Sequence, residues 1–285
     1  MRVWEKLAVC AVVAMMLPLA ACSFGGNDGN AVSNASGAQS SSSSASSAGS
    51  GSSGKPTGNG GSTADSTQRN WGDSGCDASK AVRVIIVRGT GENADDGLLN
   101  PVAAGIANAF PNNVQTTSLD YPATFDLNSV NDGVTALIAM MGGGAQQCPN
   151  QKTVLLGFSQ GAAVVGDALS KPKYRLNTAG TSDRIPQRAA DNMLATALYG
   201  DPRFNGKADY NAGGFDATKN GMLAPRSLKA LAAYARTNRI VDYCAANDIV
   251  CQEGGVEDGH RSYFSDGTRD QGTAFAVERI RAAGL

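Results

Sequence analysis

The sequence predicts an α/β domain in which a parallel sheet is covered by helices on both faces. Short apolar runs rich in β-branched residues alternate along the chain with longer helical patterns, the order typical of parallel α/β folds. These runs begin after residue 76, so roughly 210 residues form one domain. The 35 glycines suit tight turns and close packing of helices against a sheet.

The first three predicted elements are a strand, a helix and a strand. Residues 81–88 (AVRVIIVR) form a nearly continuous apolar run, as in strands buried in a parallel sheet. Residues 99–110 are predicted to be a helix with Pro101 in its first turn, where a missing N–H costs little. Residues 114–120 alternate and favour extended structure, which predicts the second strand.

The next elements are a helix, a strand and a further helix. Residues 129–141 place their apolar side chains on one helical face, namely Val130, Val134, Leu137, Ile138 and Met141. The apolar run at 153–158 predicts a strand. The helix predicted at 160–169 follows it with almost no loop.

The last part of the domain contains two more strands and two more helices. In chain order they are predicted at 194–199, 227–237, 239–243 and 273–283. The polar, irregular stretches 171–193 and 203–224 are predicted to be surface loops beside the edge of the sheet that carries the site.

Residues 1–21 have the composition of an export signal. A basic start, Met1–Lys6, precedes an apolar run at 7–17 that is too short to cross a membrane comfortably. The ending LAAC resembles the bacterial lipoprotein signal, in which Cys22 is lipidated and becomes the new N-terminus; ordinary secretion with an incidental Cys22 is the alternative. We therefore expect a protein anchored to the outer face of the cell membrane, since two acyl chains hold stably where one is marginal.

Residues 22–70 are predicted to be a tether that starts at the lipidated cysteine. They consist mainly of Ser, Gly, Ala, Asn and Thr and cannot bury a core. A Gly/Ser coil of this length spans roughly 40 Å. The folded domain is expected over residues 71–285 as a monomer, and a net charge of −1 without a long basic run argues against a nucleic acid as partner.

Four of the six cysteines fall in the predicted domain, an even set in an oxidising compartment. Cys244 and Cys251 bracket a short loop and are expected to pair, which leaves Cys76 to pair with Cys148. A zinc site is the weaker alternative, because the chain has no CxxC spacing and only one histidine.

Ser159 stands between Gly157 and Gly161, where the strand 153–158 turns into the helix 160–169. The pattern G-x-S-x-G in this context predicts a nucleophile elbow, in which both glycines are needed because a side chain at either place would crowd a neighbouring strand or helix. A serine that only caps the helix is the alternative.

A serine nucleophile needs a base, and His260 is the one histidine of the chain. It follows the last predicted strand in a glycine-rich loop, and the order Ser, acid, His is that of α/β-hydrolases. Asp242, Asp248 and Asp258 are candidates for the acid. We favour Asp248, because the expected Cys244–Cys251 bridge would fix its loop.

The loop 88–92 (RGTGE) after the first strand is the candidate for the second half of an oxyanion hole. The first donor would be the backbone N–H of Gln160 and the second that of Thr90, with its hydroxyl. Residues 89–94 also fit the dinucleotide pattern G-x-G-x-x-A, with Asp120 as a ribose-binding acid. That alternative is disfavoured because the helix starts late and an exported protein meets little nicotinamide cofactor.

Together, several motifs resemble the cutinase family of serine esterases. They are GFSQG, RGTGE, YGDP at 199–202, and C-x-x-x-D-x-x-C followed by H-x-x-Y. The resemblance extends from about Cys76 to Leu285. It implies a small α/β-hydrolase with a five-stranded parallel sheet and no large lid, which hydrolyses carboxylic esters through an acyl-enzyme without metal or cofactor.

The resemblance also implies roles for individual residues. Ser159 would be the nucleophile, Asp248 the acid and His260 the base, with Thr90 and Gln160 in the oxyanion hole. The implied disulfides, 76–148 and 244–251, are those that the cysteine spacing predicts. The aromatic residues Phe204, Phe215, Tyr263 and Phe264 are candidates for an acyl pocket, and core packing is the alternative for each.

The expected function is hydrolysis of short- to medium-chain esters at the cell surface. An acetylated-polysaccharide esterase and an acyltransferase would use the same triad and acyl-enzyme. A non-catalytic ligand-binding lipoprotein is the alternative from another class. A binding protein would have no need of a nucleophile, an acid and a base in hydrolase order.

Overall fold

A parallel sheet of six strands lies at the centre of the computed structural model, which describes residues 74–126, 128–177 and 180–285. The strands are β1 (Val82–Val87), β2 (Val114–Ser118), β3 (Lys152–Phe158), β4 (Met193–Tyr199), β5 (Asn211–Ala212) and β6 (Ile240–Tyr243). Their order across the sheet is β2-β1-β3-β4-β6-β5, and every pairing is parallel. The predicted signal, Cys22 and the tether lie outside the described residues.

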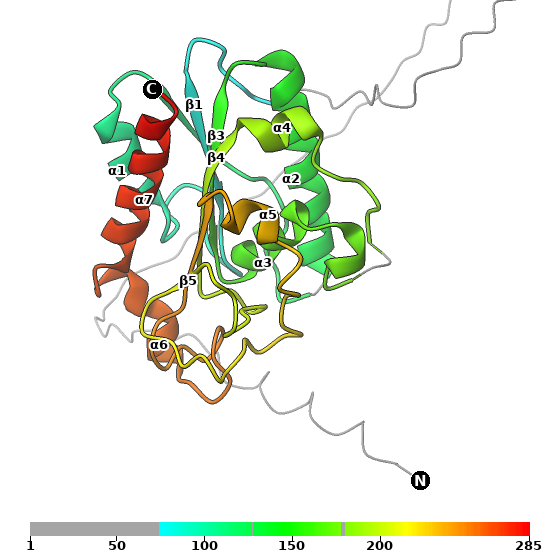
Figure 1. Ribbon diagram of the computed structural model, residues 1–285, viewed down its shortest axis with the longest axis vertical. Coiled ribbons are helices and arrows are strands. Elements are labelled where there is room, and N and C mark those ends of the chain that lie inside the picture. The colour runs from blue at the N-terminus through cyan, green and yellow to red at the C-terminus, as the bar shows by residue number, and fades with distance from the viewer. Residues whose placement is uncertain (1–73, 127, 178–179) are drawn as a thin grey trace, which may run out of the picture. The chain divides into compact units, whose positions relative to one another are not determined.

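Helices cover both faces of this sheet (Figure 1). The α-helices are α1 (Asn100–Ala109), α2 (Asn128–Gln147), α3 (Gln160–Leu169), α4 (Gln187–Asn192), α5 (Ala232–Ala235), α6 (Glu257–Arg261) and α7 (Thr268–Ala282). On one face α1 packs beside α7, and on the other α2 packs beside α3. None of the helices in the described part of the chain is long and apolar enough to cross a membrane.

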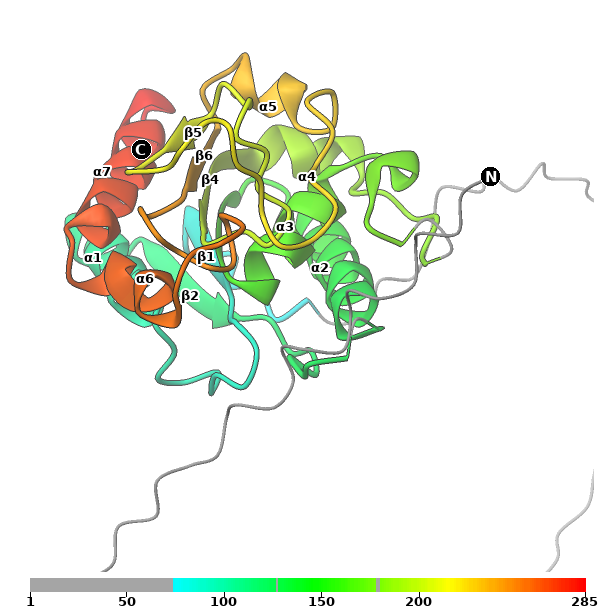
Figure 2. The same ribbon diagram turned by 90° about the horizontal axis from the view of Figure 1, so that it is seen from below.

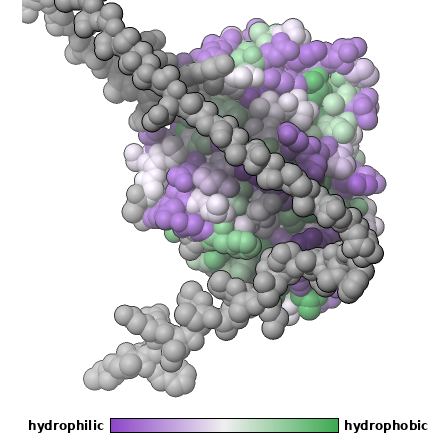
Figure 3. All heavy atoms as spheres, turned by 180° about the vertical axis from the view of Figure 1, so that it is seen from behind, coloured by the Kyte–Doolittle hydropathy of each residue, from purple (hydrophilic) through white to green (hydrophobic). Residues whose placement is uncertain are grey.

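The strand side chains divide between two hydrophobic cores, as a period of two requires. On β1, Ile85 and Val87 belong to the core under α2 and α3, whereas Val84 and Ile86 belong to the core under α1 and α7. The strands are buried on both faces, which explains why their sequences are nearly continuous apolar runs. Away from the cores, polar side chains lie over much of the face seen in Figure 3.

The sheet has one strand more than the five predicted. The additional strand, β5, has only two residues and lies within the stretch 203–224 that was predicted to be irregular. It pairs with the end of β6, where the amide of Asp242 donates to Tyr210 O at 3.0 Å and that of Cys244 to Ala212 O at 2.9 Å. A pairing this short leaves no alternation in the sequence by which to recognise it.

Three helices differ clearly in length from their predictions. The helix α2 continues to Gln147, six residues beyond the predicted end at Met141. The helix predicted at 227–237 is limited to α5, four residues long, and a turn precedes it. None of its four residues is fully buried, although Leu231 before it is, and so short a helix gains little from its own hydrogen bonds. By contrast α7 begins at Thr268, five residues before the predicted start, because Asp266 Oδ1 accepts the Thr268 N–H at 2.8 Å and holds the first turn.

Two disulfides are present in the described residues. Cys76–Cys148 ties the segment before β1 to the end of α2, and Cys244–Cys251 closes a loop after β6. The second bridge lies at the end of the molecule where α6 is found, which Figure 2 views from below. This is where the carboxyl ends of the parallel strands converge, the usual position of a site in such a fold.

Candidate active site

Ser159 occupies a strained turn between β3 and α3. Its backbone has φ 54° and ψ −122°, a conformation that costs a non-glycine residue free energy and that persists where the surrounding structure enforces it. Ser159 stands at the N-cap position of α3, but its side chain makes no capping hydrogen bond. The hydroxyl is therefore not used to cap the helix and is presented to the end of the sheet.

The two glycines of the turn are where close packing demands them. A Cβ at Gly157 would lie 2.8 Å from Gly161 O and 2.9 Å from Ala162 Cα, at the start of α3. A Cβ at Gly161 would collide with the carbonyl oxygens of Val87 and Arg88, at the end of β1. The predicted crowding by the neighbouring helix and strand is thus present at both positions.

The structure brings Ser159, His260 and Asp248 together although 101 residues separate the serine from the histidine. His260 Nε2 lies 2.9 Å from Ser159 Oγ, and His260 Nδ1 lies 3.0 and 3.1 Å from the two carboxylate oxygens of Asp248. An Nδ1–H that donates to Asp248 leaves Nε2 as an acceptor for the serine proton. This is the arrangement that general-base activation of a hydroxyl requires.

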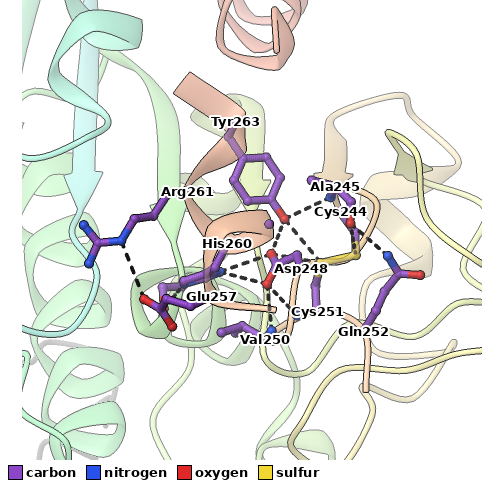
Figure 4. A network of polar contacts seen from close by, with 12 residues as sticks. Cys244, Ala245, Asp248, Val250, Cys251, Gln252, Glu257, His260, Arg261 and Tyr263 are labelled. Carbon is purple, nitrogen blue, oxygen red and sulfur yellow. Dashed lines mark hydrogen bonds and ion pairs between the residues drawn. A yellow bond between two sulfur atoms is a disulfide. The ribbon is translucent and has the colours of Figure 1, made fainter. Parts of the chain in front are cut away.

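Asp248 is fully buried at the centre of a polar network (Figure 4). Its Oδ1 accepts the Val250 N–H at 2.7 Å, and its Oδ2 accepts a short hydrogen bond from the Tyr263 hydroxyl. The Cys244–Cys251 disulfide closes the loop that carries it. A buried carboxylate needs such donors in place of water.

The other two candidate acids lie elsewhere. Asp258 is exposed on α6, and Asp242 is buried within β6. Burial, followed by repulsion from Asp201, raises the pKa of Asp242 well above its usual range. Neither side chain hydrogen-bonds to His260 within the described part of the chain, whereas Asp248 contacts it with both oxygens.

His260 lies on the short helix α6 and not in a loop, as the glycine-rich sequence had led us to predict. The glycine before it allows this helix to pack closely, because a Cβ at Gly259 would collide with the carbonyl of Asn247. The imidazole is nearly buried and stacks on Phe158, with ring centroids 4.8 Å apart. The ring is thus held in place from one side by the residue that precedes the serine.

The loop after β1 packs directly against the serine. A Cβ at Gly89 would lie 2.9 Å from Phe158 Cδ1 and 3.2 Å from Ser159 Cβ, so a side chain here would push against the residues of the turn. The carboxylate of Glu92 holds the loop by accepting the Gly89 N–H at 2.6 Å and the Leu98 N–H at 3.0 Å. Glu92 is a structural residue that the sequence alone did not reveal.

The amides of Thr90 and Gln160 donate to no protein acceptor among residues 74–126, 128–177 and 180–285. That of Gln160 begins α3, so the positive end of the helix dipole adds to it. The Gln160 side chain is held aside, because its Nε2 donates to Thr124 O at 2.6 Å and its Oε1 accepts from Ser129 Oγ at 3.2 Å. One free amide directly after the nucleophile and another in the loop packed against it are suited to bind an anionic oxygen.

A buried network of charges lies behind the site and was not predicted. Arg226 is fully buried and pairs with Asp167 of α3 and with Asp201, the latter at 2.8 Å. Burial opposes its charge, but attraction to Asp201 and Asp167 prevails and raises the pKa of Arg226. Arg203 reaches the same oxygen of Asp167 at 2.5 Å. Buried ion pairs thus fasten the stretch 203–224 to the fold, at its first residue and just after its last.

The aromatic candidates for an acyl pocket pack into the interior. Phe204 is fully buried and lies edge-on to Phe215 at 5.2 Å, beside the Cys244–Cys251 bridge. Tyr263 is fully buried, and the half-buried Phe264 lies edge-on to Phe158 at 5.4 Å. Core packing therefore accounts for Phe204, Phe215 and Tyr263. Within the described residues, no group of three or more His, Cys, Asp or Glu side chains is arranged to hold a metal ion.

Comparison with known proteins shows a consistent set of relatives. The family model Cutinase matches residues 78–280. A cutinase from Kineococcus radiotolerans is 30% identical over 208 residues, a match that covers 71% of this chain and 63% of that protein's length. Acetylxylan esterase 2 from Talaromyces purpureogenus is 27% identical over 217 residues, covering 70% of this chain and 87% of the relative. The solved structure of an acetylxylan esterase superimposes with a TM-score of 0.62 at 26% identity, over 70% of this chain and 99% of that one.

Proposed function

The chain belongs to the cutinase family of carboxylic ester hydrolases, and we propose that Ser159, Asp248 and His260 are its catalytic triad. One observation carries the proposal: an unbroken line of polar contacts runs from Ser159 Oγ to His260 Nε2 at 2.9 Å and from His260 Nδ1 to Asp248 at 3.0 Å. The strained backbone of Ser159 and the burial of Asp248 support it, since neither is needed for a serine and an aspartate that only stabilise a fold.

In this mechanism Ser159 Oγ attacks the carbonyl carbon of the ester, and its proton passes to His260 Nε2. The resulting imidazolium faces the Asp248 carboxylate, which stabilises it and holds the ring in one tautomer. Collapse of the tetrahedral intermediate breaks the bond to the alcohol, which leaves with the proton from Nε2. Water then attacks the acyl-enzyme by the same steps and releases the acid and free Ser159.

The negatively charged oxygen of the tetrahedral intermediate would accept hydrogen bonds from the backbone N–H groups of Thr90 and Gln160. Glu92 supports the first of these by holding the loop of Gly89, and Ser129 with Thr124 supports the second by holding the Gln160 side chain away. Donors that are fixed before the reaction need no reorganisation when the charge develops. The Thr90 hydroxyl is a further donor within this loop.

Short- to medium-chain acyl esters are the proposed substrates. An acetylated polysaccharide is the second candidate, and it is favoured by the match to acetylxylan esterases in both sequence and structure. Acyl transfer to an alcohol would proceed through the same acyl-enzyme. It would be recognised by a new ester among the products in place of the free acid.

The protein is proposed to act outside the cell, held at the outer face of the membrane through Cys22 or released as a secreted form. The basic start, the short apolar run and the LAAC ending support this. The paired cysteines of the folded part agree with an oxidising compartment. Incorporation of labelled palmitate into the wild-type protein but not into Cys22→Ser would test the anchor.

A series of nitrophenyl esters from acetate to palmitate tests the function. The protein is prepared without residues 1–21 and with Cys22→Ser, alongside the same protein carrying Ser159→Ala. Serine-dependent turnover is expected, and the preferred chain length would separate a deacetylase from a lipid esterase. Ser170→Ala is the matched control, since it removes a hydroxyl at the other end of α3. Absence of turnover on every ester by a folded protein would favour a ligand-binding lipoprotein.

A further inference from the structure

The hydroxyl of Tyr263 makes a direct contact with the proposed triad acid. Tyr263 is fully buried on the short 3-10 helix Ser262–Phe264, three residues after His260. Its Oη donates a short hydrogen bond to Asp248 Oδ2 and accepts the Ala245 N–H at 3.0 Å (Figure 4). One turn of chain therefore carries both the base and a donor to the acid.

The direction of this hydrogen bond is determined by the partners of the phenol. A phenol has one proton to give, and the Ala245 N–H already occupies its acceptor side. The remaining acceptors are the Asp248 carboxylate and, at 3.2 Å, the disulfide sulfur of Cys251, which is a weak acceptor. The phenol therefore donates its proton to the carboxylate. Burial, with the negative charge of Asp248 adding to it, raises the pKa of Tyr263 well above its usual value, so the phenol keeps that proton throughout the working range.

The two oxygens of Asp248 have different sets of donors. Oδ1 accepts the backbone N–H of Val250 at 2.7 Å and a longer contact from the N–H of Cys251 at 3.4 Å. Oδ2 has the Tyr263 hydroxyl as its only O–H or N–H donor besides His260 in the described part of the chain. Without the phenol, one oxygen of a fully buried carboxylate would depend on the imidazole alone.

We infer that Tyr263 is a positioning residue for ester hydrolysis, which holds the plane of the Asp248 carboxylate toward His260 and limits how strongly that carboxylate attracts the imidazolium. The inference rests on the proposed function of Asp248 and His260 as acid and base. A donor that takes up part of the carboxylate charge weakens its attraction for a proton on His260. Removing the donor should therefore make His260 hold its proton to higher pH and should loosen the geometry of the pair.

Other charged groups near this pair are common to the wild type and both variants. Asp242 on β6 interacts electrostatically with both Asp248 and Tyr263, and it is in turn influenced by Asp201 and Arg226. These groups set the background potential at the site. A change on removal of one hydroxyl is thus a change in the Tyr263–Asp248–His260 chain itself.

Tyr263→Phe is the test variant and Tyr199→Phe is its matched control. Tyr199 is also fully buried and packs edge-on against Tyr263 at 5.9 Å, but its Oη has no hydrogen-bond partner among the described residues. Both changes remove one buried hydroxyl from the same aromatic cluster and keep the ring. The Tyr263 hydroxyl contacts Asp248 and the Ala245 N–H, whereas the Tyr199 hydroxyl contacts neither of them.

The primary measurement is the titration of His260 by NMR, with protein free of any histidine tag. Because the chain has a single histidine, one imidazole signal reports it without assignment. Relative to the wild type, the midpoint should rise by about half a pH unit or more in Tyr263→Phe, as expected when a donor to a charged neighbour is lost. It should stay unchanged in Tyr199→Phe.

The second measurement is the pH profile of ester hydrolysis by the same three proteins. On the alkaline plateau, Tyr263→Phe should lower kcat about tenfold with little change in KM, since misorientation affects the reacting groups more than binding. Its acid limb should move to higher pH in step with the NMR titration. A purely structural role would lower stability and leave both readouts at the values of Tyr199→Phe.

The outcomes are distinguishable. A Tyr263→Phe protein that folds and matches Tyr199→Phe in titration and in kcat overturns the inference. If Tyr263→Phe does not fold, 3-fluorotyrosine at position 263 is the second variant, because it keeps the shape of the side chain and donates a stronger hydrogen bond. The midpoint of the His260 titration should then fall. An unchanged midpoint would overturn the inference equally. A shifted titration in a protein without esterase activity would reject the proposed function but support the coupling of these three residues.

Discussion

The α-carbon of Gly200 lies against the imidazole ring of His260. A Cβ at this position would be 2.7 Å from His260 Cε1, 2.9 Å from Nδ1 and 3.0 Å from Asp248 Oδ2. Gly200 also has φ +61°, and its N–H donates to Tyr243 O at 3.0 Å, so its backbone cannot easily move away. Gly200 of the YGDP segment therefore packs directly against His260 and Asp248 and limits their movement.

Gly200→Ala should lower kcat/KM about 100-fold or more, because a displacement of about 1 Å in the reacting groups costs that much. Gly254→Ala is the matched control, since it has φ +84° with nothing within 4 Å of the added Cβ. Both variants carry the strain of a left-handed alanine, and only the first should displace His260. Equal activities, measured on nitrophenyl acetate with both proteins folded, would contradict the role of Gly200 in positioning His260.

Activity should fall as the pH is lowered from 8 to 5, because a protonated His260 cannot accept the Ser159 proton. The measurement is kcat/KM across this range, with the titration of the single histidine followed by NMR in the same buffers. The two curves should have the same midpoint. A flat pH profile, or one that is displaced from the titration, would count against His260 as the base.

Asp242→Asn should stabilise the protein increasingly as the pH rises. The pKa of Asp242 is well above its usual range, first because of burial and then because of Asp201, whereas in the unfolded chain it is about 3.9. Between these two values the folded state binds one proton more than the unfolded state. In this pH range the free energy of unfolding of the wild type therefore decreases by about 1.4 kcal/mol per pH unit because of Asp242. The decrease ends above the pKa of Asp242 in the folded state. Asparagine does not titrate, so the variant does not show it.

Urea unfolding of the wild type and of Asp242→Asn at pH 5, 6, 7 and 8 checks this prediction. The exposed Asp258→Asn is the control, for which the difference from the wild type should be independent of pH. A pH-independent difference for Asp242→Asn as well would show that the buried carboxyl titrates normally.

Arg226→Met should destabilise the fold by about 3–5 kcal/mol, the cost of leaving buried carboxylates without their partner. Arg226 pairs with both Asp167 and Asp201, so its removal leaves the buried Asp201 without an ion-pair partner and Asp167 with Arg203 alone. The measurement is urea or thermal unfolding, with the exposed Arg236→Met as control. A loss below about 1 kcal/mol would mean that the network contributes no more than surface ion pairs do.

Much of the fold follows from local patterns in the chain. The helix predicted at 160–169 has the bounds of α3, and the strand predicted at 153–158 differs from β3 by one residue. The strand is a continuous apolar run, and the glycines on either side of Ser159 mark the tight turn between strand and helix. The two-residue β5 and the short α6 are different, because neither is long enough to show a periodicity of its own.

For the site, the sequence supplies candidates and the structure supplies their contacts. Ser159 and His260 can be singled out because one stands in a G-x-S-x-G turn and the other is the only histidine. Asp248 can be favoured among three aspartates because two cysteines bracket its loop. The loop-holding role of Glu92 and the hydrogen bond of Tyr263 to Asp248 depend on tertiary structure. The burial of Arg226 could not be predicted either. Its ion-pair partners are 59 and 25 residues away in the sequence, so no local pattern indicates them.

The central claim is that Ser159 is a nucleophile activated by His260. The most direct measurement is labelling with a fluorophosphonate, followed by intact-mass analysis and peptide mapping. The account predicts one phosphonyl group per chain, located on Ser159, with parallel loss of ester hydrolysis and no labelling of Ser159→Ala. Labelling at another residue, or full activity after Ser159 is labelled, would contradict it.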